Sequence, residues 1–441
     1  MKCGIAAFAI VACSCLAIGQ VGNTVVTKWQ YGKSGAVSLT YDDGTINQFR
    51  VAVPIMDSFG LPATFFIITG NIPGSQYHGS FVGRPTKTIV DETARVPTNR
   101  DNFFERASAI GFLGYQGTLD YHTRAGELFD EGNNVEQAHR VLDEAYAKVR
   151  NGDLPPVTSH ENTPDKRNNI TWDELLVLAH RGYEFASHTV THPRLAVLDD
   201  VNLVYELERS RQDILDHLGF KHTFSVECPY GTENQRAVSA ALLRYQVARN
   251  YMPDADVDDL DRSNNLDPVL SRKEYVRWQR GALTETPIGL MKSWVDKTAA
   301  QGNIGLVLVF HGVDGVGWKP TTAGELKNYF SYIDSMKQRL WVATFQDVTK
   351  YIRERQHGRV ASYRDGKVIS VLLRNDLTDM SYDLPLTLKT YVPEEWKTVE
   401  VRQGERTEDL AVVGSGDKRY VLYQAIPNAE VVTLSAGAAA Q

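Results

Sequence analysis

Cysteine is scarce in this sequence: there are four in 441 residues, and three of them lie within the first fifteen positions. The fourth, Cys228, would be alone in a chain that lost those positions, so no internal disulfide is expected. Basic residues are also in deficit, because 47 Lys and Arg face 54 Asp and Glu, for a net charge of −7. This balance gives no general electrostatic basis for binding nucleic acid or an anionic membrane surface.

Long apolar runs are missing after the first eighteen positions, so no transmembrane segment is expected there. A short apolar stretch over 3–18 follows Lys2, a pattern typical of a secretory signal peptide. We predict a signal peptide over 1–19 and a secreted or periplasmic protein. A second interpretation is a lipoprotein, since the Ile-Val-Ala-Cys segment that ends at Cys13 resembles a lipobox and would make this cysteine a lipid anchor.

The remaining composition, 42% hydrophobic and 23% charged, is that of an ordinary globular protein. A β-rich run over 36–41, a helix-spaced segment over 47–58 and an apolar run over 63–69 form a β–α–β pattern. Further strand–helix pairs follow after residue 170, and polar residues end several of these strands. The pattern predicts a barrel-like α/β domain over 20–356.

Two parts of the chain depart from that pattern. Residues 71–169 contain Gly, Pro and Asn clusters and one clear helical segment over 135–149, so we predict a long insertion in the barrel. After residue 358, short β-rich runs alternate with turn residues and no helical pattern is present. This predicts a small all-β sandwich over 359–436.

Five polar side chains stand at or just after the ends of predicted strands: Asp42, Asp43, His188, His192 and His311. The carboxyl ends of barrel strands meet at one face, so these side chains are expected to lie together. Asp43, His188 and His192 have the composition of a catalytic metal site that leaves positions open for water and substrate. Asp42 could then serve as a base and His311 as an acid. Taken singly, each residue is more often structural; their joint occurrence favours the metal site.

Four short motifs, in this order, resemble those of the polysaccharide deacetylases, the NodB-homology carbohydrate esterases. The sequence LTYDDG at 39–44 resembles the first motif, and HTVTHP at 188–193 matches the second. The segments CPYG at 228–231 and LVLVFH at 306–311 resemble the third and the fifth. The resemblance covers about residues 25–354 without the insertion, and it implies a distorted (β/α) barrel of about seven units.

The resemblance also implies a reaction and its participants. Hydrolysis would remove acetyl groups from N- or O-acetylated sugars with a divalent ion, most often Zn²⁺, with Co²⁺, Ni²⁺ and Mn²⁺ as alternatives. By motif position, Asp42 resembles the base that deprotonates the attacking water, and His311 resembles the acid that protonates the leaving group. The metal ligands would be Asp43, His188 and His192.

Further residues follow from the same motifs. The backbone N–H of Tyr230 would stabilise the tetrahedral oxyanion, a role that suits a fixed donor. We also predict substrate contacts from Pro229, Trp278 and Trp318.

One position departs from the family pattern. The third motif usually has an arginine two residues before its proline, and this chain has Glu227 there. A glutamate cannot pair with Asp42 and would repel it. Either another cation, Arg249 or Arg277, takes that place, or the base is tuned differently.

The sequence therefore predicts a metal-dependent hydrolase that deacetylates a polysaccharide or oligosaccharide. Two alternatives stay open at this point: an amidohydrolase acting on a non-acetyl C–N bond, and a carbohydrate-binding protein that has lost catalysis. The substitution at Glu227 favours the second alternative. The retained base, acid and metal ligands oppose it, because a binding protein does not need them.

Overall fold

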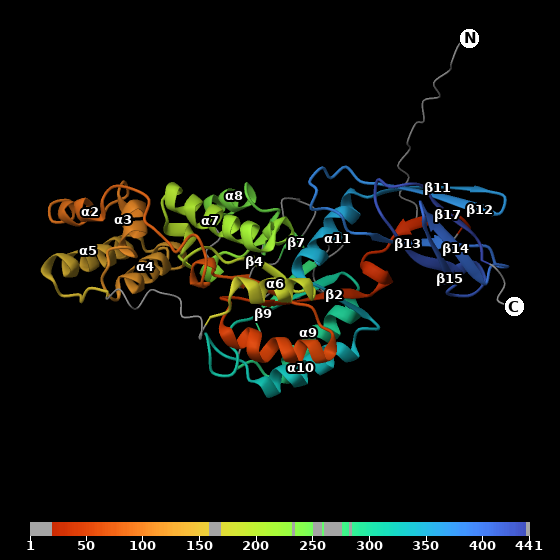
Figure 1. The fold of residues 1–441 in the computed structure, drawn as a ribbon, viewed down its shortest axis with the longest axis horizontal. Coiled ribbons are helices and arrows are strands. Elements are labelled where there is room, and N and C mark those ends of the chain that lie inside the picture. Colours follow the sequence, from red (N-terminus) through yellow and green to blue (C-terminus); the bar gives the residue numbers. More distant parts are fainter. Residues whose placement is uncertain are drawn as a thin grey trace, which may run out of the picture. The chain divides into compact units, whose positions relative to one another are not determined.

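The computed structural model describes residues 20–157, 169–231, 234–249, 258–259, 276–281 and 285–437 (Figure 1). The predicted signal peptide and the lipid anchor at Cys13 lie outside these residues and stay predictions. The chain divides into two units, one formed by Lys33–Lys350 and the other by Met1–Gly32 with Tyr351–Gln441. None of the helices described is both long enough and apolar enough to cross a membrane.

A parallel sheet forms the centre of the first unit. Its strands are β2 (Gly35–Tyr41), β3 (Thr64–Ile67), β4 (Glu184–Ser187), β5 (Ser225–Val226), β6 (Val247–Ala248), β7 (Asp258–Asp259), β8 (Val276–Gly281), β9 (Ile304–Phe310) and β10 (Leu340–Val342). They pair in the order β6–β5–β4–β3–β2–β9–β8–β7, and β10 pairs with the first half of β2. Every strand pair in this sheet is parallel. Within the described residues β6 does not pair with β7, so the sheet is an open, distorted barrel, which confirms the predicted fold class.

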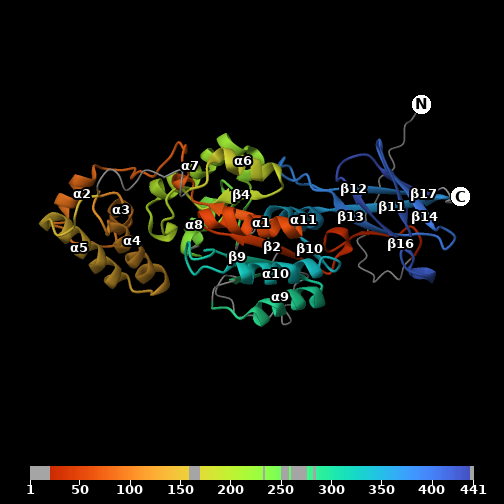
Figure 2. The same ribbon diagram turned by 60° about the horizontal axis from the view of Figure 1, so that its bottom comes forward.

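Helices cover the outer face of this sheet. They are α1 (Val53–Phe59), α6 (Trp172–His180), α7 (Asp200–Leu218), α8 (Gln235–Leu242), α9 (Ile288–Gln301) and α10 (Ala323–Ser335). The start of α11 (Phe345–His357) instead packs against the other face, where Phe345 contacts Phe66. Figure 2 shows α9 and α10 along β2 and β9. Side chains alternate between the two faces of a strand, so Val37, Leu39 and Tyr41 join the core beneath the helices. The next residue in register, Asp42, points to the opposite, inner face.

The insertion between β3 and α6 has a core of its own. Its helices are α2 (Thr86–Glu92), α3 (Phe103–Ile110), α4 (Thr118–Gly126), the short π-helix η4 (Glu127–Glu131) and α5 (Val135–Asn151). They lie together in Figures 1 and 2 and bury Phe103, Leu142 and Tyr146 among themselves. The sequence had indicated only the last of these helices, because the others are short and broken by polar and glycine residues.

The second unit contains two antiparallel sheets. Their strands are β1 (Thr24–Val26), β11 (Arg359–Asp365), β12 (Val368–Arg374), β13 (Leu386–Tyr391), β14 (Thr398–Gln403), β15 (Arg406–Ala411), β16 (Tyr420–Ala425) and β17 (Val432–Ala436). The sheet orders are β1–β13–β16 and β11–β12–β17–β14–β15, so the predicted all-β part at the C-terminal end is present. The sequence placed residues 20–32 in the barrel domain. The structure groups them with the second unit, because β1 pairs with β13 in the register Thr24↔Thr390.

A buried carboxyl group lies at the start of β4. Glu184 Oε2 accepts hydrogen bonds from Thr64 Oγ1 at 2.6 Å and from the Gln346 N–H at 2.9 Å, and Oε1 accepts from Ser225 Oγ at 2.9 Å. Burial outweighs these bonds and raises the pKa of Glu184 to about 7. When protonated, the carboxyl can donate from Oε1 to the Ser225 hydroxyl, which is free to turn and accept.

Replacing Glu184 by glutamine is expected to stabilise the protein above pH 7. The folded pKa of about 7 exceeds the ordinary value of 4.5, so the group's contribution is complete below the ordinary value and is lost as the pH rises through 7. The full difference is on the order of 3 kcal/mol. Urea unfolding at about pH 5 and about pH 8.5 measures it. Glu136→Gln, at an exposed site of α5, is the control, and an equal pH dependence in wild type and Glu184→Gln would contradict the prediction.

Candidate active site

The ends of the two central strands bring Asp42 and His311 together. Asp42 follows β2 and His311 follows β9, and these strands are paired up to Tyr41↔Phe310. Gln48, which is fully buried, donates from Nε2 to the carbonyl oxygens of both residues, at 2.8 Å for His311. Asp42 Oδ2 lies 3.4 Å from His311 Nε2. The structure therefore places the predicted base and the predicted acid side by side.

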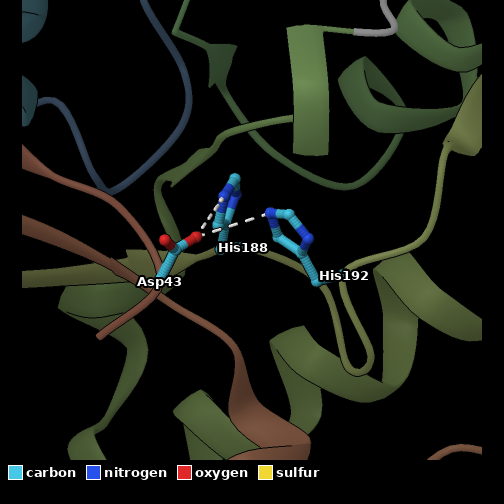
Figure 3. A group of neighbouring side chains, drawn as sticks. All are labelled: Asp43, His188 and His192. Carbon is cyan, nitrogen blue, oxygen red and sulfur yellow. Dashed lines mark ion pairs between the residues drawn. The ribbon is translucent and has the colours of Figure 1, made fainter. Parts of the chain in front are cut away.

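The three predicted metal ligands converge at the same face (Figure 3). Asp43 Oδ1 lies 3.6 Å from His188 Nε2 and 3.5 Å from His192 Nε2. Ligand atoms about 2.0–2.2 Å from a tetrahedral ion lie about 3.4 Å apart, so this set fits a divalent ion of zinc's size. Two imidazoles and one carboxylate also form a donor set that such borderline ions prefer. The three residues can therefore hold a metal.

The tautomer of His188 also suits a metal ligand. Its Nδ1 lies 2.9 Å from the carbonyl oxygen of Glu227, which can only accept, so Nδ1 carries the proton. The lone pair of Nε2 then faces Asp43 and the site. A backbone carbonyl behind a ligating imidazole fixes the orientation of the ring and raises its basicity.

The loop that carries both histidines is held in a strained shape. Thr189 and His192 have φ of 69° and 61°, and Asp43 has φ of 75°, although none is a glycine. Each such conformation costs on the order of 1 kcal/mol and persists only where the surroundings enforce it. Glu206 of α7 does so here, because its carboxylate accepts from Val190 N and Thr191 N at 2.9 Å each and from Thr191 Oγ1 at 2.6 Å. Sequence reasoning missed this glutamate, since a charged residue inside a long charged helix gives no signal.

A buried arginine, Arg249, supplies the cation beside Asp42 that the third motif lacks in this chain. Arg249, at the end of β6, binds Asp42 with both terminal nitrogens, Nη1–Oδ1 at 2.6 Å and Nη2–Oδ2 at 2.8 Å. Its Nε lies 2.9 Å from Glu227 Oε2, so one cation lies between two carboxylates, all three almost fully buried. The predicted repulsion between Glu227 and Asp42 is thus offset. Of the two candidate cations, Arg249 takes the position; the side chain of Arg277 lies outside the described residues.

The two adjacent aspartates have opposite electrostatic environments. Burial acts to raise the pKa of Asp42, but Arg249, together with His311 and His188, holds it well below its usual range. Burial and the charge of Asp42 raise the pKa of Asp43 to about 7. A divalent cation at the three donors would reverse the second shift. Asp42 therefore stays ionised beside the site, as a proton acceptor requires.

These groups open into one cavity of about 670 Å³. It is lined by Asp42, Asp43, Glu127, Glu131, His188, His192, Arg194, Tyr230, Arg249, Gly281, Val309, His311 and Trp318. Trp318 is half exposed and packs against His311 with ring centroids 4.8 Å apart. A cavity of this size accommodates a sugar unit, and the indole offers an apolar face to it.

Of the other residues predicted to contact the substrate or the oxyanion, Tyr230 lines the cavity and Pro229 does not. Tyr230 lines the cavity with φ of 59°, and its ring lies 4.6 Å from that of His192. Among the described residues its N–H has no hydrogen-bond acceptor, whereas the next N–H, that of Gly231, donates to Cys228 O at 3.2 Å. Pro229 is buried and is not among the residues that line the cavity. Trp278 lies on β8, but its side chain is outside the described residues.

The insertion contributes a wall of the cavity that the sequence did not reveal. Glu127 and Glu131 of η4 line it together with Arg194, which follows the second histidine motif. The sequence pattern could not bring these residues together, because the insertion showed no motif and its packing depends on tertiary contacts.

Comparison with known proteins matches this chain to one family. The sequence model of the family "Polysaccharide deacetylase" matches residues 30–95 and 128–247. A curated relative, a gellan lyase of a Bacillus species, is 24% identical over 277 residues, which are 59% of this chain and 11% of that protein. The chain therefore spans about a tenth of the length of this relative.

Two solved structures of carbohydrate esterases are weakly similar to this chain. The Xyl-CE4 domain of a xylanase from the hindgut metagenome of Trinervitermes trinervoides is 12% identical, with 72% of this chain and 90% of that chain covered and a TM-score of 0.33. A family 4 carbohydrate esterase from Streptomyces lividans is 12% identical, with coverages of 70% and 92% and a TM-score of 0.31.

Proposed function

We propose that this chain is, through its barrel, a polysaccharide deacetylase, and that it removes acetyl groups from a glycan with a divalent ion held by Asp43, His188 and His192. The observation that carries the proposal is the convergence of these three donors beside an ionised Asp42 in one cavity. Zn²⁺ is the ion that the donor set and the spacing favour.

The side chains around the cavity supply proton transfer in both directions. Asp42, kept ionised by Arg249, accepts a proton from the attacking water. His311, 3.4 Å from Asp42, donates a proton to the departing amine or alkoxide. A divalent ion at the three donors would polarise the acetyl carbonyl and make the attacking water more acidic.

The oxyanion of the tetrahedral intermediate needs donors that are already in place. The N–H of Tyr230 suits this role, since the residue lines the cavity beside His192 and its N–H has no hydrogen-bond acceptor among the described residues. The size of the cavity and the exposed Trp318 suit a sugar unit as the group that carries the acetyl. We further propose that the protein acts outside the cytoplasm, on the basis of the apolar N-terminal stretch.

The proposal is tested by acetate release from purified protein that has been stripped of metal and reloaded with Zn²⁺ or Co²⁺. The substrates are chitin oligomers, acetylxylan, peptidoglycan and an acidic glycosaminoglycan. We expect turnover to fall to background after stripping and to return in proportion to the metal bound, up to one ion per chain. Release from one member of the panel names the substrate class and distinguishes N-acetyl from O-acetyl.

Variants of two histidines test whether turnover is lost because the metal is lost. His192→Asn is expected to lose the ion and the turnover together, whereas His180→Asn, exposed at the end of α6, should keep both. Metal content measured by mass spectrometry on the same samples gives a readout that does not depend on the substrate. No bound metal in wild type would contradict the site; bound metal without acetate release would favour hydrolysis of another C–N bond or a binding role.

A further inference from the structure

One buried side chain of the active-site loop, that of Arg194, contacts the insertion. Only 4% of this residue is exposed, and it follows the second histidine motif directly. Its Nη2 lies 3.1 Å from Glu127 Oε1, and its Nη1 pairs with Glu131 Oε1. Both glutamates belong to η4 of the insertion. Two carboxylates therefore fix the plane of the guanidinium from one side.

Two further contacts hold the rest of Arg194 against the insertion. Its N–H donates to His122 Nε2 at 3.0 Å, and His122 Nδ1 lies 2.8 Å from the Ala107 carbonyl, so this imidazole is neutral and its tautomer is fixed. Gly126, the last residue of α4, leaves room for the aliphatic stem: a Cβ there would lie 2.5 Å from Arg194 Cδ. The position of the arginine is thus set by residues of the insertion.

The other side of the guanidinium meets the predicted oxyanion donor. Arg194 Cζ lies 4.5 Å from the centroid of the Tyr230 ring, within the range of a cation–π contact. Tyr230 also contacts His192 and has a left-handed backbone with φ of 59°. A non-glycine residue keeps such a conformation only where its surroundings hold it. Here the Gly231 N–H closes a turn onto Cys228 O at 3.2 Å, and Arg194 and His192 contact the ring.

From these contacts we propose that Arg194 is a positioning residue through which the insertion controls turnover. Glu127, Glu131 and Gly126 place the guanidinium, the guanidinium holds the ring of Tyr230, and the ring holds the backbone N–H toward the cavity. The insertion then serves catalysis directly and is not only a wall of the cavity. The effect on turnover rests on the proposed function, whereas the effect on the backbone of Tyr230 does not.

Two variants test this arrangement, one at Arg194 itself and one at the glycine of the insertion beside its side chain. Arg194→Lys keeps the charge and loses the planar group, and Gly126→Ala leaves the cavity residues intact and displaces the stem of Arg194. We expect kcat for acetate release to fall about 10- to 100-fold in both, with KM within about threefold of wild type, because an oxyanion donor acts on the transition state. Metal content should stay unchanged.

Gly111→Ala is the matched control for the glycine. It lies in the same insertion with φ of −64°, and a Cβ there meets only Leu119 Cδ1, at 3.8 Å. Since alanine favours helix over glycine, neither alanine variant should destabilise its helix through backbone propensity. We therefore expect Gly111→Ala to keep the wild-type kcat.

Crystal structures of wild type, Arg194→Lys and Gly126→Ala complete the test. We expect Tyr230 to leave the left-handed region in at least one variant, and this result stands whether or not any glycan is hydrolysed. An unchanged Tyr230 backbone in both variants would overturn the proposal. Wild-type kcat in Gly126→Ala with a displaced Arg194 would also overturn it, whereas an inactive wild type would count against the proposed function alone.

Discussion

Replacing Arg249 by methionine is expected to abolish turnover and to destabilise the protein by about 3–5 kcal/mol. The variant would leave the carboxylates of Asp42 and Glu227 buried without the cation between them, and a buried charge without a partner is costly. Asp42 would then take up a proton at neutral pH and could no longer accept one from water. Acetate release and urea unfolding on the same preparation measure the two losses.

Two companion variants keep this prediction testable if Arg249→Met folds poorly. Arg249→Lys retains a positive charge but not the pair of bonds to Asp42, so it should fold and lose most of its turnover. The exchange Glu227→Arg with Arg249→Glu restores a cation at the third-motif position and should recover part of the stability. Arg244→Met, which breaks an ion pair with the half-exposed Glu208, should cost less than about 1 kcal/mol. Wild-type turnover in Arg249→Lys would contradict the assigned role.

The contact between Arg249 and Glu227 could not be predicted from the sequence, unlike the positions of the motif residues. The short motifs predicted that Asp42, Asp43 and the two histidines lie together, and the structure brings them together, because each motif is a local turn after a strand and the strands of a parallel barrel end at one face. Arg249 lies beside Glu227 because β5 and β6 pair in the register Val226↔Ala248. That register depends on the packing of two-residue strands, and no pattern in the sequence encodes it.

The same reason explains why the sequence did not indicate some other residues. Glu206 reaches the histidine loop from the interior of α7, and Arg194 meets η4 across more than sixty residues of chain. The strand β1 is only three residues long and is stabilised by pairing with β13, so its sequence alone does not identify it. In each case the residue is ordinary in its own segment and acquires its role through a distant contact.

Replacing Asp42 by asparagine is expected to lower kcat about 10²- to 10⁴-fold and to leave the metal in place. The amide has the shape of the carboxylate and can still accept from Arg249, but it cannot take a proton from water. The three donors that would hold the ion, Asp43, His188 and His192, are unchanged. Acetate release, metal content and thermal unfolding measured together distinguish loss of the base from loss of the fold.

Asp43→Asn is the comparison that separates loss of the base from loss of a metal ligand. Asp43→Asn changes the same chemical group one residue along the chain, but its carboxylate faces the two histidines, at 3.5 and 3.6 Å. It should therefore lose metal affinity as well as turnover. A base and a ligand next to each other in sequence are thus told apart by metal content alone. Equal loss of metal in both variants would mean that Asp42 also holds the ion, and unchanged turnover in Asp42→Asn would favour a protein that binds glycans without hydrolysing them.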